Sequence, residues 1–405
     1  MNAPLAGIRV VSIEQAVAAP ICTRHLLDLG AEVIKVEPPA KGDFSRRYDR
    51  IFGDQSTHFV WLNHGKRSVA VNFHTAAGRG VVERLIASAD VFVCNLSARA
   101  AERAFPYEQV QALNPSIVAA YITGYGQDGP YRDRRAYDLL VQAEAGAIAS
   151  TGTPGHYAKM GVSVADLATG VYALAIINAA LVRRRTTGEG DRITVNLFDS
   201  LVEWMMPLLL EQRATGQSPV PVGTRHATLV PYGPFAAGDD VELVIGIQTE
   251  EQWVRLCRDV IGDPELADDV VLQSNSGRLA RREYVESRVA AGTARLASAQ
   301  LIERLDEYGI PWSHLRSLAE VVEHPQIVAR GRWHPVLLPD GATTDVLAPP
   351  FSLDGMTVAD EMRRVPALGE HTGAVLFELG YSESEVAELD QAGVLSLPAS
   401  SARPA

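Results

Sequence analysis

The sequence of 405 residues predicts an α/β fold, in which a large domain contains a doubly wound parallel sheet and a smaller domain is of α+β type. Three observations support this prediction. Short β-branched runs alternate with helical patterns over residues 7–126. A long apolar helical pattern follows at residues 161–185. A stretch rich in Pro, Gly and Thr at residues 213–228 then separates this half from a hairpin and further helical patterns.

The first half of the chain contains three strand and helix units. The first unit is the strand IRVVSI, a helix PICTRHLLDLG that ends at Gly30, and the strand AEVIKVE. The second is SVAVNF, a helix around GRGVVERLIASA, and DVFVCN; the third is the helix PYEQVQALN and the strand IVAAYITGYG. This alternation predicts a Rossmann-like sheet with helices on both faces. The loops Glu37–Asp43, Asn95–Arg103 and Thr123–Tyr137 should therefore line a crevice at one edge of it.

Two nucleotide-binding signatures are missing from this half. The place after the first strand, where a G-x-G-x-x-G would stand, is occupied by Glu14 to Pro20, so a dinucleotide site of the usual kind is not expected. The sequence contains no P-loop, which argues against a nucleoside triphosphatase.

The stretch GVSVADLATGVYALAIINAALVRRR predicts a long central helix. Ser163 and Asp166 have the spacing of a capping box, and cationic side chains at residues 183–185 suit its last turn. An apolar stripe should be buried, formed by Leu167, Val171, Leu174, Ile177 and Leu181. The positive end of a helix stabilises the ionised form of a carboxylate placed there, and an ionised carboxylate can act as a nucleophile. From this local pattern alone, Asp166 is either a simple cap or a nucleophile.

The rest of the chain completes the domain plan. We assign residues 1–200 to the large domain, 201–225 to a linker, and 226–325 to the small domain, which begins with the hairpin pattern YGPFAAGDDVELVIGI. Residues 326–395 contain few strand patterns and should return to the large domain. Residues 396–405 are expected to be disordered.

Composition limits the class of protein. A net charge of −12 argues against a general nucleic-acid binder and against an anionic membrane surface. The three cysteines are far apart, as in a reducing compartment, and the ten histidines show no metal-ligand spacing. The N-terminus lacks the layout of a signal peptide, and charges or Gly interrupt every long apolar run. We therefore expect a cytoplasmic protein with no membrane partner, no nucleic-acid partner and no metal.

Six stretches in order carry a resemblance to a known family. They are GIRVVSIEQAVAAPICTRHLLDLGAEVIKVEPP, LNHGKRSVAVNF, DVFVCN, LNPSIVAAYITGYGQDGPY, GVSVADLATGVYALAIINAALVRRRTTGEG and PALGEHTGAVLFELGY. From about Leu5 to Val394 the chain resembles the class III CoA-transferase family, also called the CaiB/BaiF family. The resemblance implies an interlocked homodimer, with Asp166 as a covalent nucleophile. It also implies an acyl-CoA thioester and a carboxylic acid as substrates, with no permanently bound cofactor.

The resemblance also implies candidate contacts for CoA. They are Lys66, Arg67, Asn95, Arg103, Arg135 and Tyr137. Each cation could instead be an ordinary surface charge, and Tyr137 could be a core aromatic residue. His226, after the linker, is a further candidate to approach the site, although a surface role is the simpler interpretation.

Departures from the family pattern leave alternatives open. Some members carry a Gln near the first strand, whereas this chain has Ala18 at that place and Gln15 three residues earlier. The glycine-run loop of formyl-CoA transferases is missing, which argues against formate and oxalate exchange. The α-methylacyl-CoA racemases of the family need a His at the place where this chain reads Ala136-Tyr137-Asp138. The alternatives are a racemase-type isomerase, an intramolecular CoA transferase acting on one dicarboxylate, and a binding protein without activity. Several stretches resemble relatives that use dicarboxylic acids, so succinyl-CoA or another dicarboxylyl-CoA is the expected donor.

Overall fold

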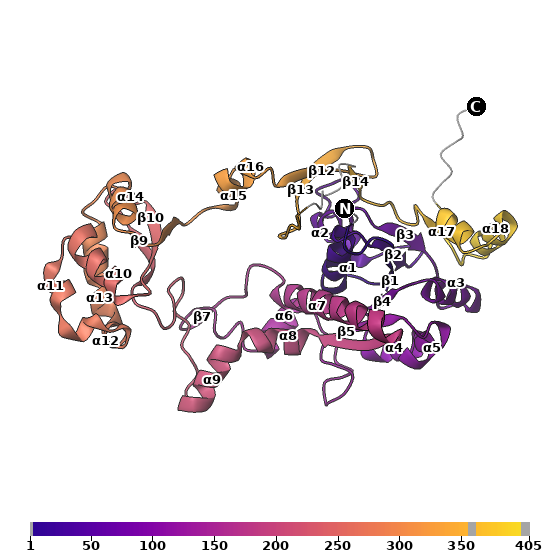
Figure 1. Ribbon diagram of the computed structural model, residues 1–405, viewed down its shortest axis with the longest axis horizontal. Coiled ribbons are helices and arrows are strands. Elements are labelled where there is room, and N and C mark those ends of the chain that lie inside the picture. The colour runs from indigo at the N-terminus through magenta and orange to yellow at the C-terminus, as the bar shows by residue number, and fades with distance from the viewer. Residues whose placement is uncertain (1–2, 355–361, 398–405) are drawn as a thin grey trace. The chain divides into compact units, whose positions relative to one another are not determined.

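The computed structural model describes residues 3–354 and 362–397, which fall into two compact units (Figure 1). The first unit contains the described residues within Met1–Ala147, Met160–Thr215 and Ala329–Ala405, and the second contains Ile148–Lys159 and Gly216–Val328. The short hairpin β6 (Gly152–Thr153) and β7 (His156–Tyr157) thus belongs to the second unit, where Gly223 donates its N–H to the Gly152 carbonyl. The predicted disordered tail lies outside the described residues from position 398 onward.

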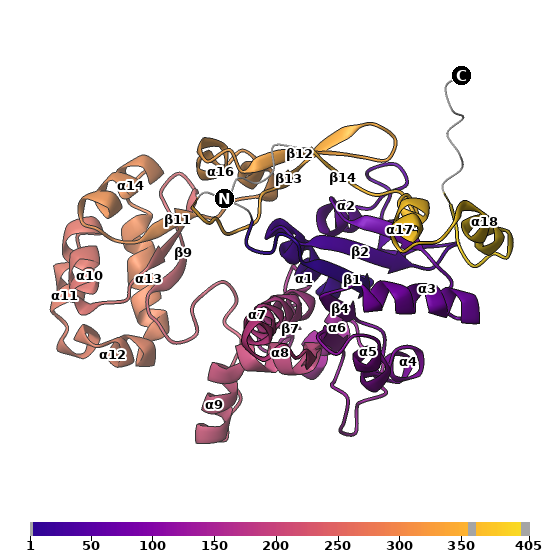
Figure 2. The same cartoon turned by 45° about the vertical axis from the view of Figure 1, so that its right-hand side comes forward.

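A six-stranded sheet forms the centre of the first unit (Figures 1 and 2). Its order is β3-β2-β1-β4-β5-β8, and every neighbouring pair is parallel, which confirms the predicted parallel sheet. The strands are β1 (Arg9–Ile13), β2 (Glu32–Glu37), β3 (Arg67–Ala70), β4 (Val91–Cys94), β5 (Val118–Thr123) and β8 (Asp191–Asn196). The strand order reverses between β1 and β4, so ligands should bind beyond the carboxyl ends of these two strands.

Alternate residues of the strands face two separate cores. Val10 and Val93 pack among the helices α1, α6, α7 and α8, whereas Val11 and Phe92 pack among α3, α4, α5, α17 and α18. The helices of the first group are α1 (Ala18–Asp28), α6 (Asp138–Glu144), α7 (Val164–Thr187) and α8 (Leu197–Trp204). Those of the second are α3 (Ala76–Ala87), α4 (Ala98–Ala104), α5 (Tyr107–Leu113), α17 (Thr372–Glu378) and α18 (Glu383–Gln391). The period-two pattern of each strand therefore supplies one apolar set to each face.

The segment that follows α8 is helical where the sequence predicted a linker. The end of α8 and helix α9 (Met206–Thr215) occupy the predicted linker at 201–225 as far as Thr215. The extended stretch begins only at Gly216, close to the Pro- and Gly-rich residues that marked it in the sequence. The apolar residues of 201–212 continue a helical pattern, which accounts for the difference.

Residues 326–395 were expected to contain few strands, and this prediction is wrong. Strands β12 (Trp333–Leu337), β13 (Thr343–Leu347) and β14 (Arg363–Arg364) form a small sheet. Asp340-Gly341 turns the chain between the first two, and Gly341 has a φ of 89° that suits glycine. The sheet packs on α2 (Thr57–Asn63) through Phe59, Val336 and Val365. The described residues from Ala329 onward belong to the first unit.

The second unit combines a small antiparallel sheet with helices around its own core. The sheet order is β11-β10-β9, with β9 (Tyr232–Ala236), β10 (Glu242–Gly246) and β11 (Trp312–His314). The helical segments are α10 (Glu250–Arg255), η2 (Leu256–Val260), α11 (Pro264–Asp268), η3 (Val270–Gln273), α12 (Asn275–Ala280), α13 (Arg282–Thr293) and α14 (Ser298–Glu307). Trp253 and Leu243 lie at the centre of the core. Two short helices follow, α15 (Leu318–Val322) and α16 (Pro325–Ala329).

Helix α7 is the longest helix among the described residues, and it packs across α1. Ile177 and Leu181 of the predicted stripe are buried, but Val171 is 49% exposed, because Ala165, Ala168 and Ala173 supply much of the buried face. By length and composition alone α7 could cross a membrane, yet half of its most apolar window is buried within the protein.

Gly170 is the point of closest approach between α7 and α1. A Cβ atom there would lie 2.2 Å from Cγ2 of Ile21 and 2.7 Å from the carbonyl oxygen of Ala18. Contacts this short require the helices to move apart. The missing side chain therefore sets the spacing of the two helices.

We expect Gly170→Ala to destabilise the protein by about 1–3 kcal/mol, although alanine is the better helix former. Gly80→Ala in α3 is the matched control, since nothing lies within 4 Å of its added Cβ, and it should stabilise slightly. Urea unfolding of both variants measures the difference. An unchanged or raised free energy of unfolding for Gly170→Ala would contradict the close crossing.

Candidate active site

Asp166 is the third residue of α7, at the end of the helix that carries unpaired backbone N–H groups. Its side chain is partly exposed, so a ligand can reach it. Burial and the nearby carboxylate of Asp138 raise the pKa of Asp166 to about 7. The sequence predicted that the helix N-terminus would favour the ionised form, whereas desolvation and the like charge of Asp138 favour the protonated form.

The turn before α7 is braced from α6 and not by the predicted capping box. Ser163 is the N-cap residue but makes no side-chain cap hydrogen bond. Instead, the N–H of Ala165 donates to Oδ1 of Asp138 at 2.8 Å. The buried Gln142 donates through Nε2 to Oδ2 of Asp138 at 2.7 Å and accepts the N–H of Met160 at 2.9 Å. Asp138 therefore both caps the helix and places a negative charge near Asp166.

Tyr48 is influenced by the charge of this carboxylate. Burial, followed by the charges of Asp43 and Asp166 and by Tyr137, raises the pKa of Tyr48 to about 12. Tyr48, which the sequence analysis missed, is therefore influenced both by Asp166 and by the predicted residue Tyr137. Tyr48 comes just after η1 (Phe44–Arg47), which continues the loop after β2 that was predicted to line the crevice. Its position beyond that loop was the available signal.

The predicted residue Lys66 is buried inside an ionic network. Its Nζ donates to Oε1 of Glu14 at 2.7 Å, to Oγ1 of Thr23 at 2.7 Å and to Oδ1 of Asn63 at 3.1 Å. Burial lowers the pKa of Lys66 to about 8, and the charge of Glu14 only partly offsets it. In this arrangement its ammonium holds protein groups and is not presented to a phosphate.

The same network continues at the carboxyl end of β2. Lys35, also fully buried, donates to Oδ2 of Asp43 at 2.8 Å and to the Glu14 carbonyl at 3.1 Å. Arg46 from η1 makes two hydrogen bonds to Glu37, at 2.7 and 2.9 Å. Despite its burial, Glu37 has a pKa of about 2, because Arg46 stabilises its charged form.

The predicted residue Asn95 clamps the loop between β1 and α1. Its Oδ1 accepts the N–H of Gln15 at 3.0 Å, and its Nδ2 donates to the Gln15 carbonyl at 2.8 Å. The next residue, Ala16, has a φ of 63°, and its N–H donates to Oδ1 of Asp43 at 3.2 Å. Ala18 is the buried first residue of α1. The loop at the switch point of the sheet is therefore fixed from both sides.

The other predicted cations lie apart from this cluster or on the surface. Arg67 pairs with Glu32, the first residue of β2, and with Glu378 at 2.7 Å, so its guanidinium faces the amino ends of the strands. Arg103, in the last turn of α4, and Arg135, before α6, are both exposed. Their contacts with CoA remain predictions.

His226 belongs to the second unit and is exposed. Its ring stacks on Tyr232 with centroids 5.2 Å apart. Its Nδ1 accepts the N–H groups of Thr228 and Leu229 at 3.2 and 3.1 Å. These bonds place the ring proton of the neutral imidazole on Nε2.

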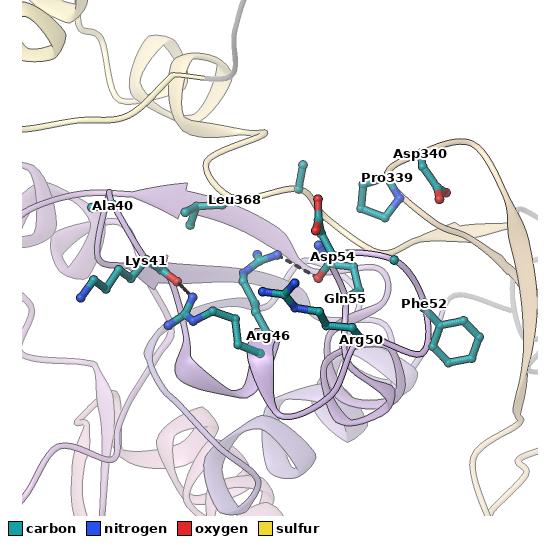
Figure 3. Close-up of a pocket in the computed structure, with 13 residues that line it drawn as sticks. Ala40, Lys41, Arg46, Arg50, Phe52, Asp54, Gln55, Pro339, Asp340 and Leu368 are labelled. Carbon is teal, nitrogen blue, oxygen red and sulfur yellow. Dashed lines mark hydrogen bonds between the residues drawn. The ribbon is translucent and has the colours of Figure 1, made fainter.

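A cavity of about 790 Å³ opens beside η1 (Figure 3). Its lining includes Lys41, Arg46, Arg50, Gln55, Asp340 and Leu368. None of the predicted site residues lines it. Within residues 3–354 and 362–397, no group of three or more His, Cys, Asp or Glu side chains could hold a metal ion.

Comparison with known proteins gives consistent matches over the whole length. The model of CoA-transferase family III matches residues 5–372. A succinate–glutarate CoA-transferase of Agrobacterium fabrum is 32% identical, over 93% of this chain and 96% of its own. A succinyl-CoA:glutarate CoA-transferase of Mus musculus is 33% identical, over 97% and 90%. The crystal structure of a CaiB/BaiF family protein from Brucella suis superposes with a TM-score of 0.77 and 32% identity, over 94% of this chain and all of that one.

The Asp138 brace predicts a shift in the titration of Asp166. Asp138→Asn keeps an oxygen for the N–H of Ala165 but removes the like charge, so the pKa of Asp166 should fall below about 7. Carbon-13 NMR of labelled aspartate carboxyl groups measures this, with Asp166→Asn identifying the signal. Asp133→Asn, at an exposed side chain, is the control and should leave the titration unchanged. A pKa that does not fall in Asp138→Asn would show that Asp138 does not set it.

Proposed function

The chain belongs to CoA-transferase family III, and we propose that it moves CoA from a dicarboxylyl-CoA, such as succinyl-CoA, to a carboxylic acid through a covalent intermediate on Asp166. One observation carries the mechanism. Asp166 is accessible at the end of a half-buried helix, where Asp138 accepts the N–H of Ala165, and its pKa of about 7 leaves a large ionised fraction at neutral pH.

The reaction needs only exchanges between carboxylates and a thiolate. The ionised carboxylate of Asp166 attacks the thioester carbonyl, and the CoA thiolate leaves to give a mixed anhydride. The thiolate then attacks the aspartyl carbonyl of the anhydride, which releases the first acid and forms an aspartyl-CoA thioester. The acceptor carboxylate attacks this thioester, and the same two steps in reverse produce the new acyl-CoA and restore Asp166. Each step conserves charge and requires no net proton.

The surroundings of Asp166 suit a carboxylate nucleophile. A carboxylate whose pKa is raised is more basic, and therefore more nucleophilic, than an exposed aspartate. Partial burial also limits the access of water, which would hydrolyse an anhydride. Since the ionised form attacks, turnover should rise as the pH increases through about 7.

Two other activities of the same site are weaker candidates. A racemase-type isomerase needs two acid and base groups on opposite sides of the substrate Cα, and the residue before Asp138 is Tyr137 in place of the required His. Intramolecular transfer between the two carboxyl groups of one dicarboxylate uses the same chemistry on Asp166. An experiment that supplies a second acid distinguishes this reaction from intermolecular transfer.

The proposal extends to the assembly. Large apolar side chains are exposed along α6, α7, α8 and α9, namely Leu139, Leu140, Val171, Tyr172, Ile176, Trp204 and Leu210. An apolar face of this kind on a single chain favours association. A homodimer would cover it, and the interlocked form follows from the family resemblance. Finding folded monomer at nanomolar concentration would reject the interlocked dimer.

We also propose a cytoplasmic location, with no membrane partner and no permanently bound cofactor.

Replacing the nucleophile should separate activity from stability. Asp166→Asn should lower transfer from succinyl-CoA to glutarate by about 10³-fold or more. The same variant should be more stable than the natural protein at pH 8, by about 1–4 kcal/mol, and equal to it near pH 4. The sign follows because the folded pKa of about 7 exceeds the unfolded value near 3.8, so the folded protein loses stability as the pH rises between them.

Mass spectrometry of the newly formed thioester measures the transfer activity. Urea unfolding at pH 4 and at pH 8 measures the stability. Asp133→Asn is again the matched control, with both properties expected to be unchanged. Near-native turnover of Asp166→Asn would refute the proposed nucleophile.

A further inference from the structure

The chain leaves the first unit between α6 and α7 and then returns to it. Ala147 is the last residue before this excursion, the segment Ile148–Lys159 belongs to the second unit, and Met160 is the first residue after it. Helix α7 begins shortly after the return, at Val164, and carries Asp166 in its first turn. The place of the proposed nucleophile therefore depends on how firmly the first unit holds the point of return.

Gln142 of α6 holds both ends of this excursion. Its backbone carbonyl accepts the N–H of Ala147 at 3.0 Å. Its side-chain Oε1 accepts the N–H of Met160 at 2.9 Å, and its Nε2 donates to the carbonyl of Val162 at 3.4 Å. Gln142 and Ala147 are both 0% exposed, so bulk water does not compete for these hydrogen bonds. A single residue thus closes the excursion at its base.

The same amide group reaches the residue that caps α7. Nε2 of Gln142 donates to Oδ2 of Asp138 at 2.7 Å, while Oδ1 of Asp138 accepts the N–H of Ala165 at 2.8 Å. Ala165 is joined directly to Asp166 by the peptide bond. Because Oδ2 is held by Gln142, the carboxylate of Asp138 cannot rotate away from Ala165 without losing a hydrogen bond. Gln142 therefore acts on the position of Asp166 through the two neighbouring residues.

The directions of these bonds require an amide at position 142. The N–H of Met160 needs an acceptor, and the carboxylate of Asp138 needs a donor; the two ends of the Gln142 amide supply one each. A side chain that served only to pack α6 at 0% exposure would more often be apolar. The buried amide is therefore better explained by the groups that it connects than by packing.

We propose that Gln142 is a positioning residue for the nucleophile, which ties both ends of the excursion to the carboxylate that caps α7 and so keeps Asp166 in place for attack. This inference rests on the proposed transferase function and adds to it a residue that does not touch the substrate. Its loss should slow the reaction and leave the binding of acyl-CoA unchanged, since a displacement of about 1 Å can cost about 100-fold in rate.

The test exchanges the donor and the acceptor between positions 142 and 138. Gln142→Glu leaves two carboxylates face to face, and Asp138→Asn leaves two NH2 groups face to face. Each single variant should lower kcat for transfer from succinyl-CoA to glutarate by about 10- to 100-fold, with KM for succinyl-CoA within about threefold. Rates are compared at pH 8, where Asp166, with its pKa of about 7, is mostly ionised.

The double variant Asp138→Asn/Gln142→Glu restores the bond with its direction reversed. The amide at position 138 can donate to the carboxylate at position 142, which still offers an oxygen to the N–H of Met160. The value of kcat should therefore return to within about fivefold of that of the natural protein. A residue that only stabilised the fold would not produce this recovery in variants that are all folded.

Gln109→Glu is the matched control. Gln109 of α5 also donates through Nε2 to a carboxylate on another helix, Oε1 of Glu83 in α3, at 2.6 Å. The same chemical change made there should keep the natural kcat, whatever it does to the melting temperature. Thermal unfolding shows which variants are folded, and Gln142→Met, which offers neither donor nor acceptor at similar size, serves if Gln142→Glu is not.

Three results would overturn the positioning role while leaving the transferase function in place. They are an unchanged kcat in the folded variants at position 142, a loss confined to KM, and a folded double variant that recovers none of the lost rate. If the natural protein formed no new thioester with any acid, the proposed function itself would fail, and this inference with it.

Discussion

Six buried charges at the carboxyl ends of β1 and β2 form the interaction on which the rest of the structure depends. They are the carboxylates of Glu14, Glu37 and Asp43 and the cations of Lys35, Arg46 and Lys66. Buried ions are tolerated only when every charge is paired, and removal of one partner typically costs about 3–5 kcal/mol. Three carboxylates balance three cations, so the network has no net charge. It joins the loop after β1, the segment leading into η1, and the turn before β3.

This network determines where the reactive groups stand. Glu14 and Asp43 fix the loop that leads into α1, and Arg46 fixes η1, which is followed by Tyr48. Helix α1 in turn sets the position of α7 through the close contact at Gly170. Asp166 is then presented at the end of a helix that cannot shift easily. The cost of its partial burial appears as a raised pKa, and in the proposed mechanism the same burial would make this carboxylate a better nucleophile.

Local pattern was sufficient to predict the main sheet, because alternate apolar residues in each strand reflect burial on two faces. It also located Asp166 at the start of α7. Pattern could not reveal partners that are distant in the sequence. Lys66 was predicted as a contact for CoA, with an ordinary surface charge as the alternative, but its carboxylate partner, Glu14, is 52 residues away. Ser163 was read as the cap of α7, but Asp138 takes that role from another helix. Tyr48 lay just outside the predicted loop. Strands β12 and β13 are mostly not buried, so they lack the apolar runs that marked the strands of the main sheet.

The central claim is that CoA becomes covalently attached to Asp166 during the reaction. The direct measurement is mass spectrometry of the protein quenched after mixing with succinyl-CoA in the absence of an acceptor acid. Loss of succinate and formation of the thioester should give a mass increase equal to CoA less one water, located by peptide mapping on Asp166. An adduct on a different residue, or no adduct at any time while transfer to glutarate proceeds, would contradict the mechanism.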